Sequence, residues 1–477
     1  MNFISIEFAL FLIIVFTLYW SMRSCSLTFQ NTFMLSASYF FYGWWDWRFL
    51  ILIFGSTCID FITAIKINKS VSPSSRKAWL MISLSSNLGL LLFFKYFNFF
   101  VQSWIDAWQQ LGISMHPLSI KIILPVGISF YTFQTLSYSI DVYRKKITPT
   151  KDFISFAAFV AFFPQLVAGP IERAKNLLPQ FLTTRKFNYD LAMEGAVQIL
   201  WGLFKKTVIS NNCAPYVNTI FQNHANLPGN ALLLGAIMFS FQIYGDFSGY
   251  SDIAIGTSKL FGFRLMTNFK YPYFSRNIPD FWRRWHISLS SWFRDYVYIP
   301  LGGSKTSTYK IIRNIFIVFL VSGLWHGANW TYLAWGGIHA LLFLPFLLSR
   351  KNRRYKLSNT MGLFPNPLIV LRIITTFLLV SLSWIYFRSE NISQAHDIFL
   401  RIFSPNTYSL HWGIKPFNSY LLICFVFFLF CEWIGKNNTI PIKTKSSFLN
   451  FCMYLGVAYI TLICSYKGNI EFIYFQF

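Results

Sequence analysis

Apolar runs of about 20 residues recur along the whole chain, and each is long enough for a helix that crosses a bilayer. They predict membrane spans over residues 3–20, 28–44, 47–65, 79–101, 120–141, 188–211, 231–256, 311–330, 331–349, 366–388, 417–435 and 447–465. The first run has no basic segment before it and no small-residue cleavage site, so we interpret it as a retained span and not a signal peptide. We expect an all-α polytopic membrane protein, organised as one transmembrane domain over residues 1–477.

Lys and Arg gather after alternate predicted spans, whereas the loops 102–119 and 213–230 contain neither residue. The basic groups lie at residues 66–77, 144–151, 350–356 and 436–445. Because basic loops stay on the cytoplasmic side, this alternation places both termini outside the cytoplasm. The segment Phe153 to Pro170 is apolar but has basic groups on both sides. We expect a re-entrant element there, buried in protein or lining a cavity.

Composition agrees with a membrane protein, since 55% of the residues are hydrophobic and only 12% are charged. The net charge of +24, from 41 Lys and Arg against 17 Asp and Glu, would raise nucleic acid as a partner in a soluble protein. Basic cytoplasmic loops and contact with anionic membrane lipid explain the charge better, so we expect no nucleic-acid partner. Part of the basic surface could also attract an anionic cytosolic substrate, such as a nucleotide-bearing thioester.

His326 lies in a long apolar stretch, Ile311 to Leu348, whose other ionisable side chains are Arg313 and His339. An ionisable side chain at membrane depth is costly and usually functional. Imidazole also exchanges a proton near neutral pH. His326 is therefore a candidate general base, and a hydrogen-bonded structural histidine is the alternative.

The most polar stretch predicts a helix that begins near Pro279. Helical spacing places five side chains on one face, namely Trp282, Trp285, His286, Leu289 and Phe293, and places Arg283, Arg284 and Arg294 toward the other face. One interpretation is an interfacial amphipathic helix with a tryptophan belt. The other is a helix that lines a donor entrance, with His286 turned inward and the arginines near anionic groups.

Residues 244–252 place two carboxylates, Asp246 and Asp252, and the hydroxyl of Ser248 inside a predicted span. Intramembrane Asp tends to face a cavity or a partner. The arginines of residues 276–294 are candidate partners, and structural neutralisation is the alternative to a functional role. The polar side chains between Ser129 and Asp141 more often join helices than bind substrate.

Metal and nucleophile motifs are absent from the sequence: it has no H-E-x-x-H, no G-x-S-x-G and no Walker A pattern. The seven cysteines form no C-x-x-C pair. We therefore expect no metal, no disulfide framework and no ATP-driven pump.

Three runs, GDFSGYSD at 245–252, NIPDFWRRWHISLSSWFRDYVYIPLGG at 277–303 and SGLWHGANW at 322–330, resemble the membrane-bound O-acyltransferase (MBOAT) family in this order. The branch they resemble contains alginate and peptidoglycan O-acetyltransferases. FYTFQTLSYSIDVYR at 130–144 and FFPQLVAGPIER at 162–173 resemble that branch as well. The resemblance extends over roughly residues 1–470.

The resemblance implies a ring of about 10–12 transmembrane helices with re-entrant and interfacial helices, in which two funnels meet near a catalytic histidine. His326 matches the family's invariant histidine and His286 its second polar position. The implied reaction moves acetyl from cytosolic acetyl-CoA toward an alginate-type polysaccharide or peptidoglycan, from the bacterial inner membrane. We expect substrate contacts from Asn329, Trp325, Arg283, Arg284, Asp246 and Ser248, the first two as oxyanion stabilisers.

The C-terminal run Glu471 to Phe477 resembles an aromatic tail with one tyrosine that occurs in some members of this branch. There the tyrosine is proposed to carry the acyl group. The resemblance implies that Tyr474 takes acetyl with His326 as base and passes it to an extracytoplasmic SGNH-hydrolase-like acetyltransferase. An interfacial aromatic anchor is the alternative for the tail. The alternative for the whole protein is a non-catalytic membrane transporter of acetyl groups or glycan.

Overall fold

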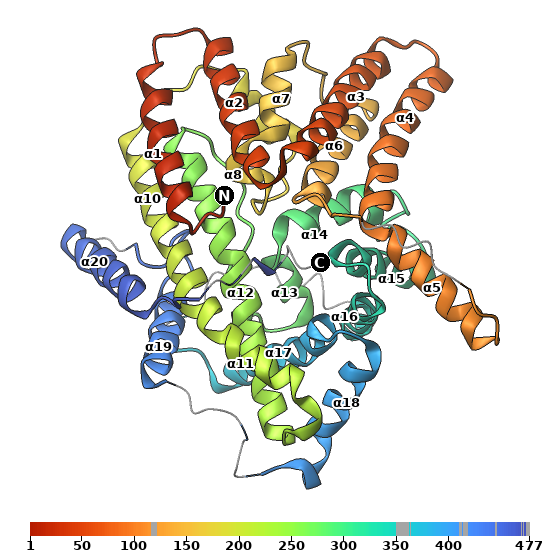
Figure 1. Ribbon diagram of the computed structural model, residues 1–477, viewed down its shortest axis with the longest axis vertical. Coiled ribbons are helices and arrows are strands. Elements are labelled where there is room, and N and C mark those ends of the chain that lie inside the picture. The colour runs from red at the N-terminus through yellow and green to blue at the C-terminus, as the bar shows by residue number, and fades with distance from the viewer. Residues whose placement is uncertain are drawn as a thin grey trace. The chain divides into compact units, whose positions relative to one another are not determined.

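The computed structural model describes residues 1–115, 122–349, 362, 364–409, 413, 418–443, 446–468, 470 and 472–473. Every regular element in these ranges is a helix, as the apolar runs predict (Figure 1). The chain divides into two compact units. Unit 1 comprises Met1–Ala196 with Ala254–Met266, and unit 2 comprises Val197–Ile253 with Thr267–Phe477. Organisation as a single transmembrane domain stays a prediction.

Unit 1 is built from the N-terminal helices. They are α1 (Ile6–Ser21), α2 (Leu27–Asp46), η1 (Trp47–Phe49), α3 (Leu50–Lys69), α4 (Pro73–Leu91), η2 (Leu92–Tyr96), α5 (Phe97–Gln110), α6 (Ile128–Tyr143), α7 (Phe153–Ala161), α8 (Phe163–Leu166), α9 (Ala174–Phe181) and the beginning of α10 (Tyr189–Leu203). The end of α12 (Gly229–Leu260) also belongs to this unit.

Unit 2 holds the rest of α10 and α12 together with the C-terminal helices. They are η3 (Phe204–Ser210), α11 (Asn211–Gln222), η4 (His224–Asn226), η5 (Pro272–Phe274), α13 (Ile278–Arg284), α14 (Ile287–Phe293), η6 (Arg294–Tyr298), α15 (Thr308–His326), α16 (Trp330–Leu348), α17 (Pro367–Arg388), α18 (Ile392–Phe403), η8 (Pro405–Thr407), α19 (Ser419–Ile434) and α20 (Ser447–Cys464). Of these, η3 and η6 are π-helical turns.

Seven helices in the described ranges are long and apolar enough to cross a membrane. They cover Leu27–Lys69, Pro73–Gln110, Gly229–Leu260, Thr308–His326, Trp330–Leu348, Pro367–Arg388 and Ser447–Cys464. The first of them comprises α2 and α3, which lie at two predicted spans and are separated at Asp46, whose backbone is extended. The apolar helices α1 and α19 lie at predicted spans but are only 16 residues long.

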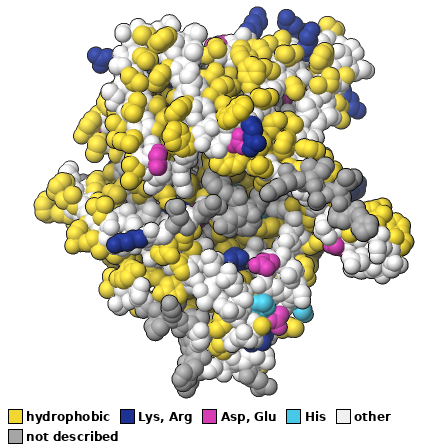
Figure 2. Space-filling model, viewed as in Figure 1, with side chains coloured by type: hydrophobic (Ala, Val, Ile, Leu, Met, Phe, Trp, Pro, Cys, Tyr) yellow, Lys and Arg dark blue, Asp and Glu magenta, His cyan; other side chains and the backbone are white. Residues whose placement is uncertain are grey.

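Large apolar side chains are exposed on the outer faces of these helices. On α1, Ile6 is 78% exposed and Ile13 is 63% exposed, and on α20 Leu462 is 82% exposed. Figure 2 shows a face that hydrophobic side chains cover widely and that few charged groups interrupt. A water-soluble protein rarely exposes apolar surface on this scale, so these faces are suited to lipid.

The segment predicted to be re-entrant forms two short helices, α7 and α8, and not a continuous span. The two helices are separated at Phe162, and every residue from Ser155 to Leu166 is buried. Burial in protein is the condition under which interrupted backbone is tolerated at membrane depth.

Glycines allow the helices of unit 2 to pack at very short range. A side-chain carbon at Gly202 of α10 would lie 2.6 Å from the carbonyl oxygen of Gly249 in α12. On the α15–α16 hairpin, such a carbon at Gly323 would lie 2.2 Å from the carbonyl oxygen of Tyr332. Small residues spaced four apart, here Gly245 and Gly249, are typical of close helix packing in membranes.

The predicted continuous helix after Pro279 is wrong. Helix α13 ends at Arg284 and α14 begins at Ile287. Between them His286 adopts a left-handed backbone conformation, with φ 44° and ψ 55°, which cannot continue a right-handed helix. The break turns the two helices into separate supports for the side chains described next.

Candidate active site

His326 is the last residue of α15 and is buried among aromatic rings. Its ring centre lies 5.0 Å from that of Trp325, 5.2 Å from Trp335 of α16 and 5.3 Å from Phe387 of α17. Three helices therefore fix one imidazole in an apolar enclosure, where charge that develops in a reaction interacts strongly with nearby dipoles.

His286 lies next to His326, although 40 residues separate them in sequence. The two imidazole centres are 6.4 Å apart, and the Trp325 ring lies 5.8 Å from His286. An oxygen hydrogen-bonded to a ring nitrogen lies about 4 Å from the ring centre, so one oxygen can contact both imidazoles. The left-handed backbone of His286 is a conformation that costs about 1–3 kcal/mol and tends to occur at functional sites.

The orientation of His286 is set by Asn268, whose Oδ1 lies 3.1 Å from its Nδ1. The same Oδ1 accepts a hydrogen bond from Ser288 Oγ at 2.9 Å, and the Asn268 amide donates to Ser251 Oγ at 3.1 Å. Because an amide oxygen only accepts, the network assigns the proton of His286 to Nδ1. Nε2 is then the acceptor, and it has no hydrogen-bond partner among the described residues.

Burial lowers the pKa of His286 to about 3, so the ring is neutral at pH 7. A neutral imidazole with a free acceptor nitrogen can take a proton or hold a hydroxyl group. Asn268 is not among the predicted site residues, because it belongs to no motif of its own. The signal available was its place in the polar stretch before the histidine.

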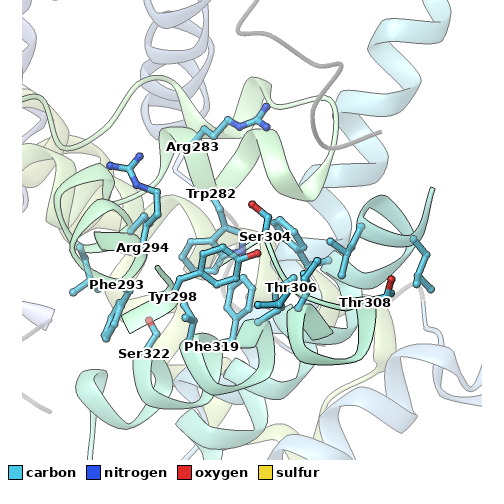
Figure 3. Close-up of a pocket in the computed structure, with 18 residues that line it drawn as sticks. Trp282, Arg283, Phe293, Arg294, Tyr298, Ser304, Thr306, Thr308, Phe319 and Ser322 are labelled. Carbon is cyan, nitrogen blue, oxygen red and sulfur yellow. The ribbon is translucent and has the colours of Figure 1, made fainter. Parts of the chain in front are cut away.

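A cavity of about 820 Å³ lies beside this site, which is within the usual size range of ligand pockets (Figure 3). Arg283 and Arg294 lie along one edge of it with their guanidinium groups turned outward, and Phe319 and Ser322 lie on the opposite side. The α15 face that lines the cavity includes Ile311, Ile315, Phe319 and Ser322. His326 follows Ser322 by one helical turn on α15 and is not one of the residues that line the cavity.

The two arginines predicted to contact substrate, Arg283 and Arg284, have different surroundings in the structure. Arg283 lines the cavity, whereas Arg284 is buried and its Nε pairs with Asp280 Oδ1 at 3.0 Å. Arg294 lines the cavity in its place. The reason is that consecutive residues of a helix point about 100° apart, so Arg284 lies on the face of α13 that carries Asp280 and not on the face that lines the cavity.

Trp325 contacts both histidines, but Asn329 has a structural role. Its Oδ1 caps α16 by accepting from Thr331 N–H at 3.0 Å, and its Nδ2 donates to the Glu390 carbonyl at 2.8 Å. Stabilisation of an oxyanion by either residue stays a prediction.

The predicted pairing of Asp246 and Asp252 with arginines is wrong. Asp246 Oδ1 lies 2.6 Å from Lys206 Nζ, and Asp252 Oδ2 lies 2.6 Å from Lys205 Nζ. Ser248 Oγ accepts from Lys205 Nζ at 2.9 Å. Both lysines belong to η3, which the close approach at the glycines brings against α12. Contact of Asp246 or Ser248 with substrate stays a prediction.

Tyr474 lies outside the described residues. The two residues before it are described, and both are buried in unit 2. In the part of the chain that the structure describes, no three His, Cys, Asp or Glu side chains gather closely enough to hold a metal ion.

A model of the membrane-bound O-acyltransferase family matches residues 144–389, a range that contains both histidines and the cavity. Among similar proteins, the probable alginate O-acetylase AlgI of Pseudomonas aeruginosa is 41% identical over 80% of this chain and 71% of its own length. The peptidoglycan O-acetyltransferase of Helicobacter pylori is 35% identical over 80% of this chain and 75% of its own. The teichoic acid D-alanyltransferase of Bacillus subtilis is 32% identical over 48% of this chain and 61% of its own.

These relatives share an acyl-transfer activity, and the family model covers the part of the chain that forms the histidine site. Family membership thus favours an enzyme over the transporter alternative. With its helices suited to lipid, the chain is a multi-pass membrane protein. It belongs to the membrane-bound O-acyltransferase family and is an O-acyltransferase.

Proposed function

We propose that this enzyme transfers acetyl from cytosolic acetyl-CoA across the bacterial inner membrane for O-acetylation of an envelope polysaccharide, alginate-type or peptidoglycan. The names of its relatives support this substrate class. The observation that carries the proposal is the buried pair His286 and His326 next to a cavity with two arginines at its edge.

Acetyl-CoA suits that cavity by chemistry. Guanidinium groups bind phosphate oxygens with charge-assisted hydrogen bonds, and Arg283 and Arg294, which line the cavity, would bind the phosphates of the donor. The apolar wall of Phe319, Ile315 and Ile311 suits the pantetheine arm. With the phosphates at the arginines, the thioester points along α15 toward His326.

In the proposed reaction, His326 acts as general base for the phenol of Tyr474. As the imidazole takes the phenolic proton, the oxygen attacks the thioester carbonyl carbon and an oxyanion forms. The carbon–sulfur bond then breaks, and the thiolate of CoA leaves and takes the proton back from His326. His286, neutral with Nε2 as acceptor, orients the phenol or the imidazolium. The products are acetyl-tyrosine ester and CoA.

The second half of the reaction requires a partner outside the cytoplasm. An SGNH-hydrolase-like acetyltransferase would attack the ester, regenerate the phenol of Tyr474 and acetylate a hydroxyl of the polysaccharide. Selection among glycans then belongs to that partner and not to this chain.

The test is transfer of labelled acetyl from acetyl-CoA by the purified protein in lipid vesicles. His326→Ala should abolish the transfer, and removal of a general base alone lowers rates by about 10²–10⁴-fold. His396→Ala is the matched control, because His396 is exposed on α18. Transfer by folded His326→Ala at the control's rate would show that the histidine assignment is wrong.

A further inference from the structure

Two adjacent lysines, Lys205 and Lys206, are buried in the π-helical turn η3. The turn lies against α12 at glycines, since a side-chain carbon at Gly245 would lie 2.9 Å from the Lys205 carbonyl oxygen. π-helical turns inside longer helices are frequent at functional sites. The mechanism proposed above uses neither lysine.

The two lysines have equivalent carboxylate partners, but among the described residues only the carboxylate of Asp246 contacts the tail. Asp246 Oδ1 pairs with Lys206, and its Oδ2 accepts a hydrogen bond from the backbone N–H of Ile473 at 2.7 Å. Asp252 pairs with Lys205 and accepts instead from the Gln198 amide at 2.8 Å. The carboxylate of Asp246 therefore joins η3 to Ile473, which follows Asp246 by 227 positions in the chain.

The tail residue before Ile473 is held by aromatic rings. Phe472 is fully buried, with its ring centre 4.2 Å from Tyr250 and 6.0 Å from Phe247. The Phe247 ring in turn lies 4.6 Å from the imidazole of His286. The tail thus reaches the wall of the histidine site, and one side chain separates it from His286.

The same turn η3 also holds the start of the tail. The N–H of Tyr466 donates to the Thr207 carbonyl at 3.1 Å, and Ser465 Oγ donates to Thr207 Oγ1 at 2.8 Å. Asn212 donates to the Cys464 carbonyl at 2.9 Å. The chain after α20 is therefore tied at two points, Thr207 and Asp246.

We propose that the Lys206–Asp246 pair is a tail anchor: it binds the backbone of Ile473 and so sets the register of Tyr474 for acetylation at His326. This rests on the proposed function, in which Tyr474 carries the acetyl group. Lys206 pairs with Oδ1 of Asp246, and Oδ2 accepts the hydrogen bond of the tail, which makes Asp246 a positioning residue. A slip of one residue moves the chain by about 3.3–3.8 Å, and a misplacement of about 1 Å lowers reaction rates by about 10²-fold.

The test removes the tail's donor and leaves the ion pair intact. Ile473→Pro has no backbone N–H, whereas Ile473→Ala trims the side chain and keeps it. Each is incubated with acetyl-CoA, and acetyl on the C-terminal peptide is followed by mass spectrometry in a single turnover. We expect acetylation to slow by about 10–100-fold in Ile473→Pro relative to Ile473→Ala, with no change in the acetyl-CoA concentration for half-maximal rate. Measurable acetylation at equal rates in the two variants would overturn the anchor.

A second comparison separates an anchor from charge neutralisation. Asp246→Asn and Asp252→Asn each remove one buried carboxylate, and only the first should slow acetylation beyond about threefold. The swap Lys206→Asp with Asp246→Lys restores an ion pair but places a donor where the tail needs an acceptor. Acetylation should stay slow in the swap, and its recovery to the wild-type rate would contradict the proposal.

Failure of the acyl-tyrosine route is recognised separately. Carboxypeptidase digestion measures how tightly the tail is held and does not depend on acetyl transfer. Release of tail residues should be faster in Ile473→Pro than in Ile473→Ala. If Tyr474→Phe passes acetyl onward at the wild-type rate while this difference holds, the anchor stands and the acyl-tyrosine is wrong. If digestion of the two variants is equal, the anchor is wrong.

Discussion

Replacing His286 by asparagine should remove an acid sensitivity from the folded protein. The imidazole is fully buried beside Asn268, and its pKa is lowered to about 3 in the folded state. In the unfolded chain it takes a proton below its ordinary value of about 6.5. As the pH falls through the range between these values, the unfolded state binds a proton that the folded state does not, so stability falls.

The size of this loss follows from the two pKa values. At about pH 5 the unfolded state gains about 2 kcal/mol from protonation of one histidine, and at about pH 7.5 it gains almost nothing. Wild type should therefore lose about 2 kcal/mol more than His286→Asn between these pH values. Asparagine tolerates the left-handed backbone at this position, which limits other effects.

The assay is denaturant unfolding of both proteins in the same detergent at the two pH values. The comparison uses the change with pH, so a constant loss of packing in the variant cancels. His396→Asn is the control, because that side chain lies at the surface in the folded protein. An identical pH dependence in wild type and His286→Asn would refute the buried neutral imidazole.

Three further predictions concern other parts of the molecule. Burial raises the pKa of Glu172 to about 7. Glu172→Gln should therefore stabilise the protein above pH 7, by about 3 kcal/mol at most, and have little effect near pH 4.5. Denaturant unfolding of the variant and wild type at both pH values checks this. Gly323→Ala should lower the free energy of unfolding by about 1–3 kcal/mol through its clash with the Tyr332 backbone, whereas Gly337→Ala, with open space around it, should not; equal melting temperatures would contradict this. Arg283→Gln or Arg294→Gln should raise the KM for acetyl-CoA about tenfold or more with kcat nearly unchanged. An unchanged KM would show that acetyl-CoA does not bind in this cavity.

Most of the spans and the two histidines could be predicted because their signals are local. In the described residues, the predicted spans 120–141 and 188–211 match none of the helices long and apolar enough to cross a membrane. An apolar run of membrane length needs no knowledge of its neighbours, and the runs around His286 and His326 are long enough to identify a family. The distance between the two imidazoles could not be predicted from such local signals. It depends on a left-handed residue in the middle of a helical pattern, where the sequence has the spacing of a continuous helix.

The partners of the acidic residues were predicted wrongly for a similar reason. Charge alone made the arginines of residues 276–294 reasonable counterions. The glycines of α12, however, have no side chain and so allow η3 to pack closely against α12, which brings Lys205 and Lys206 to the carboxylates. Adjacent lysines within a predicted span were the signal that could have found Lys205 and Lys206. Asn268 had no comparable signal, because one amide in a polar stretch has no pattern.

The central claim is that His326 moves acetyl from acetyl-CoA onto Tyr474. The most direct measurement is mass spectrometry of the C-terminal peptide after the purified protein has been incubated with acetyl-CoA. We expect acetyl on Tyr474 in wild type and none in His326→Ala. Acetyl on another residue, together with full onward transfer by Tyr474→Phe, would contradict it.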